Sequence, residues 1–101
     1  MNSNINLLPL HDAVLYHIEL CWEQRICRLF LSIFLEQTQT AQPHILEFFG
    51  VSNLLVPHES PWGDSVFINT VTQTTSDIYY IEIQSGDTII ITASDFKFSL
   101  K

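Results

Sequence analysis

Histidine, cysteine and carboxylate side chains are the residues of this chain that could carry chemistry, and their spacing matches no known site. The nearest two of the four histidines, His11 and His17, are six positions apart, which is not a spacing of zinc ligands. The chain has no Gly-x-Ser-x-Gly motif, and its three glycines leave no loop that cradles phosphate. We therefore expect a protein that is not an enzyme and that holds no metal ion or cofactor.

His11 and Asp12 are neighbours that could act as an acid–base pair. Adjacent side chains of a strand point to opposite faces, however, which would separate them. Asp12 is better explained as a turn or cap residue that opens the first element.

The two cysteines, Cys21 and Cys27, fall on opposite faces of the hairpin expected below, and a disulfide cannot form in that geometry. Two free thiols are typical of a reducing compartment. The longest apolar stretch, Leu29 to Leu35, is well short of the roughly 20 residues that a bilayer requires, and the N-terminus has no basic region ahead of an apolar run. These features predict a cytoplasmic protein.

The stretch Pro57–Gly63 is expected to be a loop, because it contains two prolines and a glycine. Trp62 is fixed between Pro61 and Gly63, and it is either a lid over one end of the core or an apolar anchor at an interface. Three polar residues of the same region complete the candidate binding site. The four candidates are His58, Glu59, Trp62 and Asp64.

The charge of the chain is strongly unbalanced. Eleven carboxylates and four Lys or Arg give a net charge of −7, and no Lys or Arg lies between Arg28 and Lys97. The carboxylates in that span are Glu36, Glu47, Glu59, Asp64, Asp77, Glu82, Asp87 and Asp95. Nucleic acids and anionic membranes are bound by basic side chains, so we expect neither as a partner. The negative charge either keeps an apolar protein soluble or forms an acidic face for a basic protein.

The composition predicts a single β domain over residues 1–101. Ile, Val and Thr make up 25 of the 101 residues, and β-branched side chains favour strands over helices. Apolar residues alternate with polar ones in several short runs, which indicates antiparallel hairpins. We expect a mainly β fold in which the hairpins form a sandwich or a partly open barrel, with at most one short helix near the N-terminus.

The first hairpin is predicted to join a strand from Val14 to a strand at 25–35 through a turn at Glu23-Gln24. The apolar parity of the first strand comprises Val14, Tyr16, Ile18, Leu20 and Trp22. The register that follows pairs Ile18 with Leu29, Leu20 with Cys27 and Glu19 with Arg28. A helix over Asp12–Trp22 is the alternative, because several apolar residues of this stretch also have helical spacing.

Further along the chain, short apolar runs and structure-breaking residues define the remaining elements. Loops are expected at 36–43 and 57–63, and apolar segments at 44–51, 54–56, 66–73 and 78–84, with Gly50 as a bulge. In the last hairpin, a three-residue loop at Ser85–Asp87 pairs Ile83 with Ile89 and Ile81 with Ile91 on one buried face.

The apolar residues after this hairpin lie on the opposite parity, which implies a bend near Ser94-Asp95. They are Phe96, Phe98 and Leu100. We expect them to form an exposed strand edge or face that pairs with a second copy of the chain, giving a homodimer.

Three short motifs, in chain order, resemble a group of small uncharacterised bacterial proteins. They are Leu10-His11-Asp12, Pro61-Trp62-Gly63-x-Ser65-x-x-Ile68-Asn69 and Glu82-Ile83-Gln84-Ser85-Gly86-Asp87. The group includes immunity-protein-like members of polymorphic toxin systems, which are mostly β and bind a cognate toxin. The resemblance implies a compact β domain, makes a toxin the specific partner to consider, and assigns no catalytic residues.

Two functions are compatible with these features. The first is a non-enzymatic protein-binding domain, in its specific form an immunity protein that neutralises a basic toxin. The second is a small-ligand-binding or hydrolytic domain with a pocket between the sheet and the loop at 57–63. A flat acidic face with Trp62 at its edge would favour the first, whereas a closed apolar cavity with converging His58, Glu59 and Asp64 would favour the second.

Overall fold

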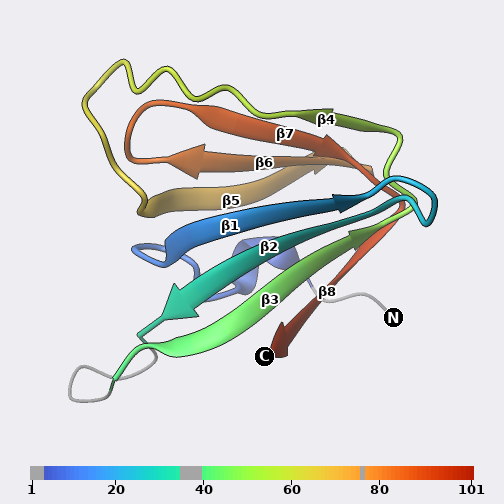
Figure 1. Cartoon of the computed structure of the whole chain (residues 1–101), viewed down its shortest axis with the longest axis horizontal. Helices are drawn as coiled ribbons and strands as arrows, with labels where there is room; N and C mark the ends of the chain where they lie inside the picture. Colours follow the sequence, from blue (N-terminus) through green and yellow to red (C-terminus); the bar gives the residue numbers. More distant parts are fainter. Residues whose placement is uncertain (1–3, 35–39, 76) are drawn as a thin grey trace.

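The computed structural model describes residues 4–34, 40–75 and 77–101, and it confirms a mainly β fold. The strands form two four-stranded antiparallel sheets, in the orders β1-β2-β3-β8 and β4-β7-β6-β5, which do not close into a barrel (Figure 1). Their bounds are β1 Val14–Cys21, β2 Ile26–Ile33, β3 Gln42–Phe49, β4 Asn53–Leu55, β5 Ile68–Thr75, β6 Ile78–Ile83, β7 Thr88–Thr92 and β8 Asp95–Leu100. A short 3-10 turn, η1 (Ile5–Leu7), precedes them. Within the described ranges, no helix has the length and apolar character needed to cross a membrane.

The first hairpin has the predicted register. β1 and β2 pair Ile18 with Leu29, Leu20 with Cys27 and Glu19 with Arg28. The backbone N–H of Arg25 donates to the oxygen of Trp22 across the predicted turn. The helix considered as an alternative for this region is wrong, because β2 buries every second side chain and supplies β1 with an antiparallel partner.

A β-bulge changes which side chains of β1 face the core. The pairing shifts by one residue between Leu15 and His17, so Tyr16 has no Cα partner in β2. Leu15 packs against the core before the bulge, and Ile18 does so after it. The prediction that Tyr16 belongs to the buried parity is therefore wrong. It is also wrong for Leu20 and Trp22, which are exposed near and beyond the end of β1 at Cys21.

The core lies between the two sheets. The fully or nearly fully buried residues from the central strands are Cys27, Leu29, Leu31, Ile33, Leu46, Phe48, Ile81, Ile83, Ile89 and Ile91. Tyr79 of β6 connects the layers, because its ring centroid lies 4.9 Å from that of Phe48 in β3 and 5.8 Å from that of Phe96 in β8. The predicted buried face of four isoleucines in the last hairpin is confirmed.

The pairing within that hairpin differs from the prediction by two residues. Ile81 pairs with Ile89, and Tyr79 pairs with Ile91. The three-residue loop is 84–86 instead of 85–87. Gly86 has φ +95°, and the third position of such a loop adopts this left-handed conformation, which favours glycine. A shift of two residues keeps every side chain on its face, so the face was predicted correctly and the register was not.

The bend expected near Ser94-Asp95 is the point where the chain passes from one sheet to the other. β7 lies beside β6, whereas β8 lies beside β3. The backbone N–H and the hydroxyl of Ser94 both donate to the oxygen of Phe49. Gly50 has φ +64°, and a Cβ there would collide with the Ser94 hydroxyl. Gly50 therefore ends β3 where the two sheets meet, and it is not a bulge within the strand.

Two predicted loop boundaries are also wrong. β3 begins at Gln42 and includes Pro43, so the loop expected at 36–43 ends earlier, and residues 35–39 lie outside the described part of the chain. Pro43 is tolerated because it lies near the start of its strand, where a missing N–H disturbs the ladder least. β5 continues to Thr75, two residues beyond the end expected for this segment.

The edge strands of the two sheets are β1, β8, β4 and β5. On the side away from β2, the described residues pair with β1 only at its start, where Val14 forms a bridge with Phe67. β4 pairs with β7 alone, and β8 pairs with β3 alone, among the described residues. Of the residues expected to form the dimer surface, Phe96 and Phe98 pack partly buried against the core, and only Leu100 is exposed.

Candidate functional site

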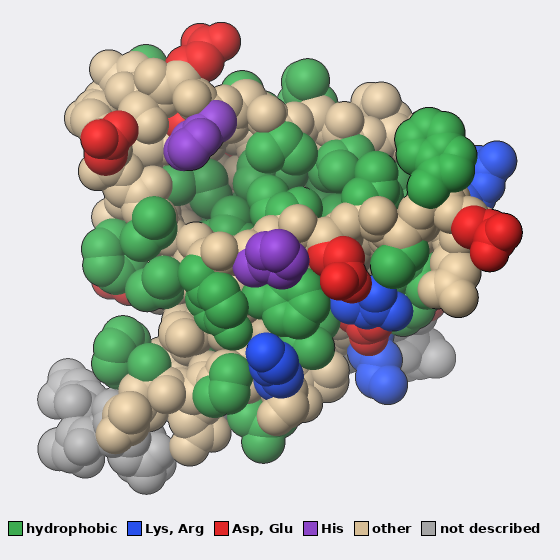
Figure 2. All heavy atoms as spheres, in the orientation of Figure 1, with side chains coloured by type: hydrophobic (Ala, Val, Ile, Leu, Met, Phe, Trp, Pro, Cys, Tyr) green, Lys and Arg blue, Asp and Glu red, His purple; other side chains and the backbone are tan. Residues whose placement is uncertain are grey.

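An open cleft of about 540 Å³ lies between β1 and the chain that follows β4, and we call it the β1 cleft. Its lining is mainly apolar and consists of Leu15, Tyr16, His17, Ile18, Val56, Pro57, His58, Ser65, Val66, Ile83, Ser85, Asp87 and Ile89. Figure 2 shows hydrophobic side chains gathered in a band across this face of the molecule.

The edge of β1 forms one wall of the cleft. Four consecutive residues, 15 to 18, line it. Successive side chains of a strand point to opposite faces, so a cleft lined by all four runs along the edge of the strand. The segment Val56–His58 forms the opposite side, and Ile83 and Ile89 from the inner face of the second sheet also line the cleft.

A buried carboxylate holds the loop at 57–63 beside the cleft. Asp87 accepts hydrogen bonds from the backbone N–H groups of Glu59 and Ser60, at 2.8 and 2.9 Å, and from the hydroxyl of Ser85 at 2.7 Å. These hydrogen bonds, with that from Glu59 the strongest influence, lower the pKa of Asp87 below its ordinary value and keep the carboxylate charged. The Ser85-Gly86-Asp87 motif thus positions the loop.

Trp62 is presented by this loop and does not cover the core. Its backbone N–H donates to the oxygen of Ser85, and its ring lies so close to Gly86 that a Cβ there would come within 2.8 Å of it. Trp62 is 78% exposed, so its interpretation as a lid over the core is wrong. The indole ring of Trp62 therefore lies against Gly86 and remains accessible to solvent.

The structure brings only one of the predicted polar residues to the cleft. His58 lines it, whereas Glu59 and Asp64 are exposed residues of the loop region and do not. Neither carboxylate has an ion-pair partner among the described residues. The β1 cleft is open, and it lacks the convergence of His58, Glu59 and Asp64 that would have favoured a small-ligand-binding or hydrolytic domain.

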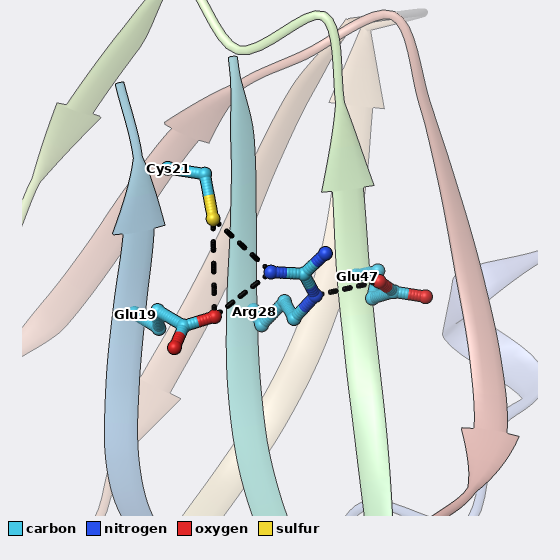
Figure 3. A network of polar contacts seen from close by, with 4 residues as sticks. All are labelled: Glu19, Cys21, Arg28 and Glu47. Atoms are coloured by element: carbon cyan, nitrogen blue, oxygen red, sulfur yellow. Dashed lines mark hydrogen bonds and ion pairs between the residues drawn. The ribbon is translucent and has the colours of Figure 1, made fainter. Parts of the chain in front are cut away.

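Several carboxylates are not available for an exposed acidic face, and Glu36 lies outside the described residues. On the outer surface of the first sheet, Arg28 donates from Nε to Glu47 and from Nη1 to Glu19, both at 2.8 Å (Figure 3). The hydrogen bond with Glu47 is the principal cause that raises the pKa of Arg28. Glu19 and Glu47 thus share one cation, and Asp87 is buried. Near the cleft, the exposed acidic side chains are those of Glu59 and Asp64.

The two cysteines are free and lie on opposite faces, as predicted. Cys21 joins the polar network of the outer surface, where Arg28 Nη1 donates to its Sγ at 3.1 Å. Cys27 points into the core, and burial raises the pKa of its thiol to about 11. The thiol of Cys27 is therefore protonated and unreactive in the folded protein.

His11 and Asp12 lie in an exposed turn before β1, as the turn prediction required. His11 Nε2 nevertheless lies 3.5 Å from Asp12 Oδ2, and its Nδ1 lies 2.7 Å from the backbone oxygen of Asn69. The expectation that the two side chains point apart is wrong, because Asp12 has φ +66° and is not extended. Across the described ranges, no three His, Cys, Asp or Glu residues are grouped so as to hold a metal ion.

A second hollow, of about 450 Å³, adjoins the other end of β1, and one strongly exposed residue that lines it was not among the predicted site residues. Trp22 lines this hollow from the β1–β2 turn and is 87% exposed. The other lining residues are Leu20, Arg25, Val51, Ser52, Asn53 and Leu54. A signal was present in the sequence, because Trp22 directly precedes the turn predicted at Glu23-Gln24.

No protein-family model matches this chain, and comparisons with curated proteins and with solved structures found no match either.

Proposed function

We propose that this chain is a non-enzymatic protein-binding domain, and that the β1 cleft together with Trp62 forms its binding surface. The observation that carries the proposal is the gathering of large exposed apolar side chains around one open cleft. Residues of this kind line the cleft or adjoin its lining in sequence, and they are Tyr16, Leu55, Val56, Val66 and Phe67. Exposed apolar patches of this sort mark interaction sites, and aromatic anchors concentrate binding energy.

The charge of the chain favours a basic partner. The net charge is −7, and Glu59 and Asp64 lie beside the cleft without an ion pair among the described residues. A negative rim attracts a positive protein and accelerates association. The specific form of the proposal is neutralisation of a basic toxin, which agrees with the resemblance of the three motifs to immunity-protein-like members of toxin systems.

Site-specific photocrosslinking in the cells that produce the protein tests the binding surface. A photoreactive phenylalanine analogue replaces Val56 or Trp62, and Lys97, an exposed residue of β8, serves as the matched control position. We expect one predominant crosslinked protein from the first two positions and none of it from position 97. The same pattern from all three positions, or no crosslink, would contradict the proposal.

The isolated partner then allows a kinetic test. Association should slow as salt rises, because long-range attraction by Glu59 and Asp64 is screened. Trp62→Ala should shorten the lifetime of the complex at every salt concentration, because it removes an apolar contact that salt does not screen. An association rate that is independent of salt would leave solubility as the role of the negative charge.

A small apolar ligand is the second candidate occupant of the cleft. The volume of about 540 Å³ falls within the range of roughly 300–1,000 Å³ that is typical of small-molecule sites. Mass spectrometry of the protein under non-denaturing conditions distinguishes this function from protein binding. A stoichiometric small-molecule adduct that disappears on denaturation would favour it over the first.

A further inference from the structure

The free edge of β1 runs beside the candidate binding surface. The β1 cleft lies along residues 15–18, and the second hollow is lined by Leu20 and Trp22. On the side away from β2, no described residue forms a backbone hydrogen bond with residues 17–21. Five residues of strand span about 17 Å, which is an ordinary length for strand pairing.

An antiparallel pairing already exists at the start of this edge. The backbone N–H of Leu15 donates to the oxygen of Val66, and Ala13 accepts a hydrogen bond from the N–H of Ile68, both at 2.8 Å. The chain before Val66 leaves the edge, since Trp62 hydrogen-bonds to Ser85 instead. The remaining edge of β1 therefore continues a ladder whose second strand has turned away.

A segment that extends this ladder would run antiparallel to β1. Its alternate side chains would face the apolar lining of the cleft, which includes Val56 and Ile89. Its C-terminal end would lie at the start of β1, near Ser65 and the unpaired carboxylates of Glu59 and Asp64. Charge complementarity then requires Lys or Arg near that end.

We propose that the partner binds by adding an extended segment to the free edge of β1 as an antiparallel strand, with alternating apolar residues and a basic C-terminal end. The inference rests on the proposed protein-binding function and specifies the chemistry and orientation of the partner. Backbone hydrogen bonds provide affinity in this mode of recognition, and alternate side chains provide specificity.

Displayed peptides test the proposal even though the partner itself is unidentified. Two libraries of segments about ten residues long alternate apolar residues with Thr, and they carry two Lys at either the C-terminal or the N-terminal end. Leu20→Lys places a charge on the apolar side of the β1 edge and should abolish enrichment. Leu7→Lys, at an exposed Leu of η1, is the matched control and should leave peptide enrichment unchanged. We expect enrichment on wild type and Leu7→Lys, mainly from the library with C-terminal Lys.

The best enriched peptide is then synthesised with single backbone N-methyl groups along its length. If it forms a strand, methylation of every second amide should weaken binding by at least about tenfold, and methylation of the others should not. Amide exchange of residues 17–21 should slow in the complex. The inference is overturned if peptides are enriched equally on wild type and Leu20→Lys, or on neither. It is also overturned if methylation of every amide weakens peptide binding to the same extent. The crosslinking experiment tests protein binding independently of strand addition. If the peptide experiments fail but crosslinks form at the cleft, the proposed function is retained and only the strand-addition inference is rejected.

Discussion

The carboxylate of Asp87 accepts a hydrogen bond from the backbone N–H of Glu59 at 2.8 Å, across a separation of 28 residues. This contact joins the β6–β7 turn to the loop that carries Trp62. The position of the loop beside the β1 cleft is therefore linked to a carboxylate in another element.

Asp87→Asn should loosen this loop and change the pH dependence of stability. The pKa of Asp87 is lowered in the folded state, so its contribution to stability is fully present above the unfolded-state pKa of about 3.9 and is lost as pH falls through the folded value. Urea unfolding at a series of pH values should show a loss in acid for wild type that is smaller in the variant. Amide exchange of Glu59 and Ser60 should accelerate in Asp87→Asn. Unchanged exchange in the variant would contradict the role of the carboxylate, and the exposed Glu82→Gln serves as control.

Gly86→Ala should destabilise the protein for two reasons that can be separated. Gly86 has φ +95°, and a Cβ there would also come within 2.8 Å of Pro61 and of the Trp62 ring. Gly63 has φ +111° and open space around its missing Cβ, so Gly63→Ala measures backbone strain alone, about 1–2 kcal/mol. We expect a larger loss for Gly86→Ala in chemical unfolding, partly recovered by Trp62→Ala in the same chain. Equal losses for the two glycine variants would show that the Trp62 contact is not tight.

Ile91→Ala should reduce the free energy of unfolding by about 2–5 kcal/mol, as truncation of a fully buried aliphatic side chain does. Ile90, its neighbour in β7, points to the other face and is only half-buried, so Ile90→Ala should cost less. Urea unfolding of both variants checks the assignment of faces. A loss below about 1 kcal/mol for Ile91→Ala would be too small for a core position.

Alkylation should distinguish the two cysteines. Burial raises the pKa of Cys27 to about 11, so iodoacetamide at pH 8 should modify half-buried Cys21 and leave Cys27 intact in the folded protein. Both thiols should react in urea. Peptide mass spectrometry provides the measurement, and rapid modification of Cys27 under native conditions would mean that the core opens locally.

The homodimer stays a prediction: β8 pairs only with β3 among the described residues, and Phe96 and Phe98 pack against the core within the fold. Leu100 is exposed at this edge, so Leu100→Lys should dissociate a dimer formed there. Light scattering over a range of protein concentrations measures the oligomeric state of the wild type and of Leu100→Lys. A wild-type monomer at the highest concentration would rule out self-association through β8.

Much of the fold is encoded in local patterns. The alternation in β2 and the cross-strand pair of Glu19 and Arg28 predicted the register of the first hairpin between its turn and the bulge, because a short turn and a buried face together leave one register. The bulge at Tyr16 was not predicted. The same logic was incomplete for the last hairpin. There the alternation of isoleucines is unchanged by a shift of two residues, and the left-handed conformation of Gly86 decides between the registers.

The candidate site depended far more on tertiary structure. The sequence alone determined that Trp62 lies on a rigid loop and that the chain is acidic. The tertiary structure decides which carboxylates are available to a partner. Arg28 forms an ion pair with Glu47 of a neighbouring strand, and Asp87 accepts a hydrogen bond from the loop. The β1 cleft itself arises from contacts between segments that are distant in the chain. A pattern of period two shows which side of a strand is buried, but it carries no information about which strand edge is left without a neighbour.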